Sequence, residues 1–531
     1  MWLNEIIFKI SHYKFSVILV ALFLLCPSLL LSQSHYHRSE KDYTKIDVNS
    51  ISAWITNYGS FFRHPTTGNS GFEWPKGSGL YALYACGLWV GALVEGKPRV
   101  AVAEYSYEYL PGTMDAETHL PNDPADPRFK VYKIQRGITD SWDYQNWPYQ
   151  DGAPLDENGD PLFIGDQTLW MVYNDADTTA HVNMLGLPLG IEVQQTVFGD
   201  LRYSTSNEII FMRWLVINKS SSYLDSIYLG LFIDPDLGDS GDDYVGCDTL
   251  LSLGYCYNSS DYDDEYGDHP PAVGFQILQG PLYESPGDNG IFEGKKIPGA
   301  NNLLMTSFVY YNSSNENNGN PQTPKEAWYR LSSRWRDGMH MTYGGSGNIP
   351  GNPKTNYMFS GDPVLGNGWL DSAPADRRFI INSGPFNLVP GDSNEMVVAV
   401  IIARGSSNLN SITELKRVAS ALKTAYNSHL YKILRSYPKK PEPIIGLKLF
   451  QNYPNPFNSQ TTITYELPIN RDVKLEIFNI QGQRVATIVD ERQEPNTYTY
   501  TWDASGLASG VYFARLKVAQ YQLTKKLLLI K

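Results

Sequence analysis

The sequence predicts a mainly β protein, in which a large β-sandwich-like body is closed by one α-helix and followed by a small C-terminal β-sandwich of immunoglobulin-like type. Aromatic residues make up 13% of the chain and charged residues only 19%, and Gly and Pro are frequent. This composition favours strands and ordered loops over helices. Short runs of alternating apolar and polar residues recur between turn signals along the chain. Only one long segment has a helical period, and it stands at the end of the body.

The body is predicted to span residues 33–436, as one or two packed sub-units. Its closing helix is expected to start at Ser411, whose hydroxyl can cap it with Glu414 three residues on, and to end near Ser436. The Pro-rich segment 437–446 cannot continue a helix, so it is interpreted as a semi-rigid linker. The main strands of the body are expected at 88–94, 99–109, 167–173, 189–198, 208–218, 226–233, 273–278, 304–311, 378–383 and 396–403.

The N-terminus, residues 1–32, is interpreted as a cleavable signal peptide. Lys9 and Lys14 precede an apolar run at 15–31, and Ser32 offers a small residue for cleavage. Pro27 interrupts the run and no basic flank follows it, so a retained membrane span is not favoured. We expect no transmembrane segment in the mature chain.

The C-terminal segment 447–531 contains seven short strand-like runs separated by turn signals, which predicts a compact antiparallel sandwich. It opens with LFQNYPNPFNSQTTITYELP and closes with QLTKKLLLIK. The distinctive positions are Tyr453, Pro454, Asn455, Pro456, Phe457, Gly482, Trp502, Asp503, Gly510, Tyr512, Lys525 and Lys526.

These spaced motifs resemble the type A C-terminal sorting domain of the type IX secretion system, found in Bacteroidota and their relatives. The resemblance implies that the secretion machinery is a partner. It also implies export through the periplasm and across the outer membrane, with release or attachment at the cell surface. Body segments such as SGFEWPKGSGLYALYACGLWVGA resemble large secreted proteins with the same sorting domain and no assigned activity, so they supply no catalytic residues.

The densest chemical feature of the body is an acidic, glycine-rich loop. Its carboxylates repel one another unless a hard cation neutralises them, and Ca²⁺ accepts many oxygen ligands in flexible geometry. The loop does not fit the EF-hand pattern, because Gly238 stands where a ligand is needed. The alternative is a solvated acidic turn. The candidate calcium ligands are Asp234, Asp236, Asp239, Asp242 and Asp243.

Three cysteines remain after processing. Cys247 and Cys256 flank a strand-like segment at a spacing that permits a disulfide without demanding one, and Cys86 is expected to be a buried free thiol. No CxxC pair is present, so the thiols are not expected to bind a metal.

The sequence offers little support for catalysis or for nucleic-acid binding. It has no GxSxG or HExxH motif and its histidines are scattered. Glu104, Glu108, Glu192 and Glu208 lie in strand-like segments and are interpreted as outward-facing. With 43 basic against 56 acidic residues, the formal charge is −13 and no basic cluster is present. Nucleic acid is therefore not an expected partner.

Aromatic residues give the remaining indication of function. Trp142, Tyr144, Trp147 and Tyr149 fall in the loop SWDYQNWPYQ, where exposed rings could stack on sugars. The alternative is that these rings fill a core. The sequence therefore predicts a secreted or cell-surface binding or structural module, with carbohydrate or a surface polymer as its ligand. The alternative class is an extracellular hydrolase acting on polysaccharide or peptide.

Overall fold

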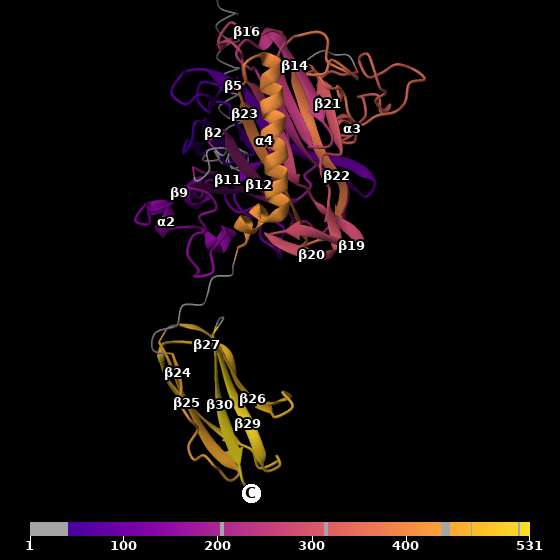
Figure 1. Ribbon diagram of the computed structural model, residues 1–531. Coiled ribbons are helices and arrows are strands. Elements are labelled where there is room, and N and C mark those ends of the chain that lie inside the picture. Colours follow the sequence, from indigo (N-terminus) through magenta and orange to yellow (C-terminus); the bar gives the residue numbers. More distant parts are fainter. Residues whose placement is uncertain (1–40, 202–206, 313–316, 437–446, 469, 519–520) are drawn as a thin grey trace, which may run out of the picture. The chain divides into compact units, whose positions relative to one another are not determined.

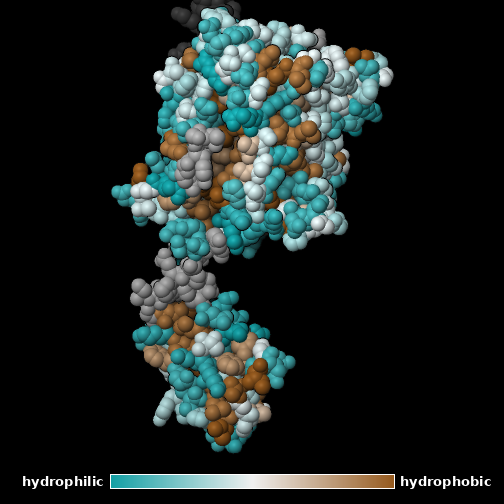
Figure 2. All heavy atoms as spheres, viewed as in Figure 1, coloured by the Kyte–Doolittle hydropathy of each residue, from teal (hydrophilic) through white to brown (hydrophobic). Residues whose placement is uncertain are grey.

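The computed structural model describes residues 41–201, 207–312, 317–436, 447–468, 470–518 and 521–531 (Figure 1). The expected signal peptide and linker lie outside these residues. The described chain forms two compact units, the body and a C-terminal unit. No helix among the described residues is long and apolar enough to cross a bilayer. Hydrophilic and hydrophobic side chains are interspersed over the visible face of each unit (Figure 2).

Two large antiparallel sheets build the body. The first has the order β21-β22-β13-β6-β3-β2-β4-β5, with β1 beside β2 and β7 beside β6. Its strands are β1 (Tyr43–Ile46), β2 (Ser52–Thr56), β3 (Ser60–Phe61), β4 (Phe72–Glu73), β5 (Tyr81–Leu83), β6 (Ala85–Val94), β7 (Lys97–Val102), β13 (Leu224–Asp234), β21 (Ser307–Tyr311) and β22 (Arg378–Leu388).

The second sheet has the order β14-β15-β18-β23-β12-β11-β10-β8, with β9 beside β10. Its strands are β8 (Leu110–Pro111), β9 (Tyr132–Gln135), β10 (Gln167–Asn174), β11 (Ile191–Gly199), β12 (Ile209–Asn218), β14 (Asp243–Asp248), β15 (Leu253–Asn258), β18 (Ala272–Gln279) and β23 (Ser393–Ala403). The two sheets share one large core, in which Phe61 of the first sheet lies 6.0 Å from Trp214 of the second, ring centre to ring centre. The predicted β-sandwich body is confirmed.

Period-two alternation places a core on each face of the second sheet. Along β23, Met396, Val398, Val400 and Ile402 face the first sheet, whereas the residues between them face a second core under the helix α4 (Asn408–Ser428). This helix lies across β15, β18 and β23 (Figure 1). Burying its apolar stripe contributes about 1.5–3 kcal/mol for each fully buried large side chain. The stripe comprises Ile412, Leu415, Ala419, Leu422 and Tyr426.

The predicted closing helix is present, but its predicted start is wrong. Ser407 is the N-cap, because its hydroxyl accepts a hydrogen bond from the Asn410 amide. Ser411 lies inside the helix, where its hydroxyl accepts from the Gly405 amide and donates to the Pro270 carbonyl. The other α-helices among the described residues of the body are α2 (Trp142–Gln145) and α3 (Pro324–Leu331). Two small hairpins are formed by β16 (Tyr262–Asp263) with β17 (Gly267–Asp268) and by β19 (Leu282–Phe292) with β20 (Lys295–Asn302).

The C-terminal unit is a sandwich of a three-stranded and a four-stranded sheet. The first has the order β24-β25-β28 and the second β27-β26-β29-β30, and both contribute to one core. The strand runs expected from the sequence are therefore present, with ends that differ by a few residues. The strands are β24 (Lys448–Leu449), β25 (Gln460–Leu467), β26 (Arg471–Asn479), β27 (Arg484–Gln493), β28 (Asn496–Asp503), β29 (Gly510–Val518) and β30 (Tyr521–Leu529).

Candidate functional site

Antiparallel pairing of β13 with β22 builds an acidic cluster in the body. Ile233 pairs with Phe379. The last residue of β13, Asp234, therefore lies beside the segment that leads into β22, and Asp376 belongs to that segment. Asp236 follows in the loop after β13, with a φ of 32° that Asp tolerates better than most residues. The sheet thus brings together carboxylates that are 140 residues apart in the sequence.

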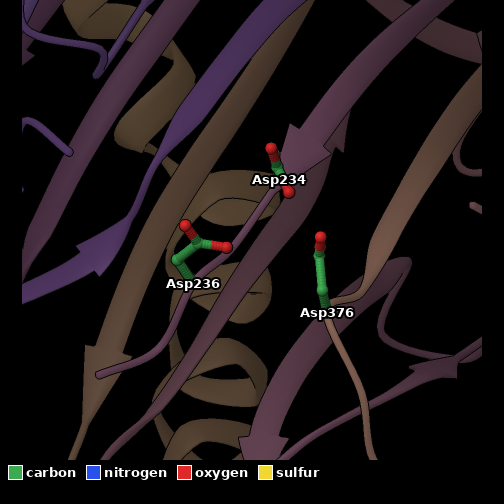
Figure 3. A group of neighbouring side chains, drawn as sticks. All are labelled: Asp234, Asp236 and Asp376. Atoms are coloured by element: carbon green, nitrogen blue, oxygen red, sulfur yellow. The ribbon is translucent and has the colours of Figure 1, made fainter. Parts of the chain in front are cut away.

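The three carboxylates converge. Asp234, Asp236 and Asp376 each offer an oxygen atom, and these atoms all lie within 4.8 Å of one another. Figure 3 shows the side chains directed toward a common space from the end of β13, the following loop and the segment before β22. Asp234 is buried, Asp236 is partly buried and Asp376 is exposed, so the cluster is open on one side.

Arg378 and Tyr105 contact this cluster. The Arg378 Nε lies 3.6 Å from Asp234 Oδ1, and its Nη2 lies 3.5 Å from Asp376 Oδ2. The Tyr105 hydroxyl donates a hydrogen bond of 2.5 Å to Asp234 Oδ2. Burial and then the neighbouring Asp236 raise the pKa of Asp234 to about 7. Burial and then Asp376 raise the pKa of Asp236 to about 6.

The other predicted calcium ligands do not join the cluster. Asp239 caps a short 3-10 turn through Gly241, and Asp242 accepts a 2.6 Å hydrogen bond from Asn258 Nδ2. Asp243 is buried and accepts from the Leu237 amide at 3.1 Å. Among the described residues, the one group of carboxylates with metal-ligand geometry is Asp234, Asp236 and Asp376. Of the five predicted ligands, the structure thus brings Asp234 and Asp236 together with Asp376, which the sequence did not indicate, whereas the other three make hydrogen bonds that order the loop.

The aromatic loop is only partly exposed, and the prediction of four sugar-binding rings is corrected. Trp147 is 5% exposed, and its indole Nε1 donates to the Pro154 carbonyl at 2.9 Å within a small satellite core. Tyr144 is stacked on Phe163. Trp142 and Tyr149 are exposed, but Trp142 stacks on Tyr132. The alternative, that these rings fill a core, holds for Trp147 and in part for Tyr144.

The disulfide that the cysteine spacing permits is not formed. Cys247 and Cys256 are buried free thiols. In the β14–β15 register Cys247 pairs with Gly254 and Cys256 with Val245, so the two cysteines are not opposite one another. The Cys247 thiol donates to the Met358 carbonyl at 3.3 Å, and the pKa of Cys256 is raised well above its usual value by burial and by Asp243. Cys86 is also buried and free, as predicted.

Two of the glutamates interpreted as outward-facing are buried. Glu108 accepts hydrogen bonds from the amides of Val102, Asn183 and Met184. Glu192 accepts from the Met114 amide at 2.8 Å. These carboxylates accept hydrogen bonds from backbone amides and so hold loops against the sheets. Glu208 is exposed, as predicted.

A cavity of about 1210 Å³ opens beside β8. Segments that are distant in the sequence line it, at 41–42, 105–110, 125–130 and 180–182. Within its lining, the Tyr107 ring packs 4.2 Å from Tyr58, and the Lys41 ammonium lies 4.8 Å from the Tyr107 ring centre. Tyr105 also lines this cavity, and its hydroxyl is the one that contacts Asp234.

In the C-terminal unit, the YPNPFN motif is bound to the last strand. Phe457 is buried against Trp502, and its amide donates to the Leu528 carbonyl. Asn455 donates to the Lys526 carbonyl and accepts from the Leu528 amide. Gly482 has a φ of 76° in the turn between β26 and β27. Tyr453, in contrast, is 82% exposed.

The family model of the secretion system C-terminal sorting domain matches residues 451–531. The chain is therefore a secreted or cell-surface protein, and its C-terminal unit is a type IX sorting domain, as predicted. This domain implies an interaction with the secretion machinery. The chain matches none of the curated proteins.

Two solved structures show weak similarity to the chain. One is a polysaccharide lyase, with 9% identity, a TM-score of 0.27, and coverage of 90% of this chain and 47% of that one. The other is dimeric latent PorU from Porphyromonas gingivalis, with 11% identity, a TM-score of 0.14, and coverage of 68% and 31%. This chain thus spans about half, or less, of the length of each of these proteins.

Proposed function

We propose that the protein enters the periplasm by means of the signal peptide at residues 1–32, and that its body acts outside the cell as a binding module for carbohydrate. The observation that supports this proposal is the cavity beside β8. Its volume, about 1210 Å³, is sufficient for several sugar rings.

The chemistry of the cavity favours a polyhydroxylated ligand. Lys41 and Lys130 are balanced by Asp42 and Asp126, so the lining has no excess charge to attract an anionic polymer. The same four groups disfavour a purely apolar ligand, because its binding would desolvate them without hydrogen bonds. Sugar hydroxyls can both donate to carboxylates and accept from ammonium groups. Tyr107 adds an aromatic ring to the lining, and a sugar would pack against the part of this ring that Tyr58 and the Lys41 ammonium leave open.

A glycan-array screen of the mature chain tests this proposal. We expect selective binding, and we expect Tyr107→Ala to weaken it by up to about tenfold, since a lost aromatic contact is worth up to about 1.5 kcal/mol. Trp142→Ala is the matched control, because Trp142 is an exposed ring that does not line the cavity. Its binding should equal that of the wild type.

Two results would contradict the proposal. One is the absence of binding across neutral and acidic glycans by a chain that calorimetry shows to be folded. The other is binding that Trp142→Ala abolishes and Tyr107→Ala leaves intact, which would move the site to the aromatic loop. Shortening of the bound glycans during the assay would instead identify the protein as a hydrolase.

A further inference from the structure

The geometry points to a divalent-cation site of the calcium type at Asp234, Asp236 and Asp376, and we propose that the bound ion fixes one wall of the cavity through Tyr105. The cation site is independent of the proposed function. The effect of the ion on ligand binding rests on the proposed function.

The arrangement of the oxygen atoms fits calcium. Two oxygens bound to one Ca²⁺ at about 2.4 Å can be at most about 4.8 Å apart. The three carboxylates place one oxygen each within that limit. Calcium also accepts irregular geometry and completes its coordination with water, and the exposed side at Asp376 admits water.

The local charge also fits a divalent cation. Asp234, Asp236 and Asp376 carry three negative charges when ionised, and Arg378 carries one positive charge. These four side chains sum to −2, and the carboxylates of Glu104 and Glu265 also act on this cluster, so the excess charge is negative and a divalent cation can offset it. The single positive charge of Arg378 leaves part of the repulsion between the carboxylates in place. This repulsion is stronger because Asp234 is removed from water.

A second observation points to a missing partner. Asp234 is 3% exposed, and its Oδ1 has no hydrogen-bond partner among the described residues. Arg378 Nε, which forms an ion pair with this oxygen, is 3.6 Å away and also lacks a hydrogen bond. A buried carboxylate oxygen without a partner is costly, so it marks a place where a ligand atom would stabilise the fold. This oxygen belongs to one of the three carboxylates of the cluster.

Tyr105 links this site to the cavity. The guanidinium carbons of Arg63 and Arg378 lie 5.8 and 5.6 Å from the centre of its ring. Its hydroxyl donates to Asp234 Oδ2, so a cation that orients this carboxylate also orients Tyr105. The segment from Tyr105 to Leu110 lines the cavity. The ion is therefore expected to order this wall and to strengthen binding there.

Calorimetric titration of the chelator-treated mature chain with CaCl₂ tests the cation site. We expect one site with a Kd in the range of about 0.1–1 mM, which is usual for extracellular calcium modules. Asp376→Asn and Asp236→Asn should each weaken binding at least about tenfold, because each removes a charged ligand. Asp264→Asn is the matched control: Asp264 is an exposed carboxylate of the same acidic region and lies outside the cluster.

The cation site is refuted if the wild type shows no binding up to about 10 mM CaCl₂, or if Asp376→Asn binds as tightly as Asp264→Asn. Circular dichroism of each variant checks that it is folded, and Asp376 suits this test because its side chain is largely exposed.

Hydrogen exchange tests the link to the cavity without a glycan. Calcium should slow the exchange of the amides at 103–110 in the wild type. Tyr105→Phe keeps the ring and removes the hydroxyl, so it should retain calcium binding while this protection is lost. Equal protection in Tyr105→Phe and the wild type, or none in either, would refute the link. If calcium protects these amides and no glycan binds, the proposed function fails and the present inference stands.

Discussion

A buried ion pair under α4 yields a prediction whose size follows from the structure. The Arg213 Nε donates to Glu395 Oε2 at 2.6 Å, and the two side chains are 7% and 0% exposed. Glu395 Oε1 accepts from Gln279 Nε2 and from the Glu293 amide, each at 2.6 Å. The Tyr426 hydroxyl of α4 donates to Gln279 Oε1. Every group of this network has a hydrogen-bond partner within it.

Arg213→Met leaves the Glu395 carboxylate buried without its cation. Removing one partner of such a pair costs about 3–5 kcal/mol. The body has about 400 residues, and the entropy of unfolding is about 2.1 cal/mol/K for each residue. A loss of about 4 kcal/mol in the free energy of unfolding therefore lowers the Tm of the body by about 5 °C. Adding Glu395→Gln removes the stranded charge and keeps an acceptor for Gln279. The double variant should therefore recover about 2 kcal/mol.

Differential scanning calorimetry of the mature chain measures these shifts. The control is Arg417→Met, which breaks an ion pair with Glu414 on the exposed surface of α4 and should change stability by less than about 0.5 kcal/mol. A Tm for Arg213→Met within 1 °C of the control would refute the reasoning. So would a double variant that is less stable than Arg213→Met, since the second change would then add a cost instead of removing one.

Three further predictions concern the sorting domain and the thiols. Deleting residues 447–531 should leave the body in the periplasm of a host with the type IX machinery, and surface delivery without this segment, seen by cell fractionation, would contradict the assignment. Phe457→Ala should destabilise the C-terminal unit by about 3–5 kcal/mol, because it empties a core position against Trp502; Tyr453→Ala, at an exposed position, should change its stability by less than about 0.5 kcal/mol. The thiols of Cys86, Cys247 and Cys256 should not react with a thiol reagent at neutral pH until the protein is denatured, since burial raises the pKa of each. Rapid labelling of the native chain would contradict the buried placement.

Local patterns predicted much of the fold. The sorting domain was recognisable because its motifs and its alternating strands are both short-range signals, and two residues of those motifs, Phe457 and Trp502, are in contact. Errors arose where two local signals compete. Ser407 and Ser411 can both cap a helix, and tertiary contacts favour the first. Residues 104–109 alternate like a strand, but β7 ends at Val102 and the chain turns there to form the cavity wall.

The candidate site depended on contacts that no local pattern contains. Asp376 joins Asp234 only because β22 pairs with β13, and nothing near Asp376 in the sequence announces that pairing. Trp147 was expected to be exposed in its loop and able to stack on a sugar, yet it packs against Trp170 of β10 in the satellite core. Glu108 and Glu192 were expected to face outward because an inward carboxylate in a strand is unusual, whereas backbone amides from distant loops hold them inside.

The contact between the YPNPFN motif and β30 makes the sorting domain sensitive to the completeness of the chain. The ribosome synthesises the YPNPFN motif about seventy residues before its partners in and after β30. These partners are Lys526, Leu528 and Ile530. A chain that stops before β30 leaves these backbone groups unpaired and leaves β29 as an unprotected edge. Such a fragment cannot close the sandwich. A folded sorting domain therefore forms only after translation has passed through the whole body and has reached β30.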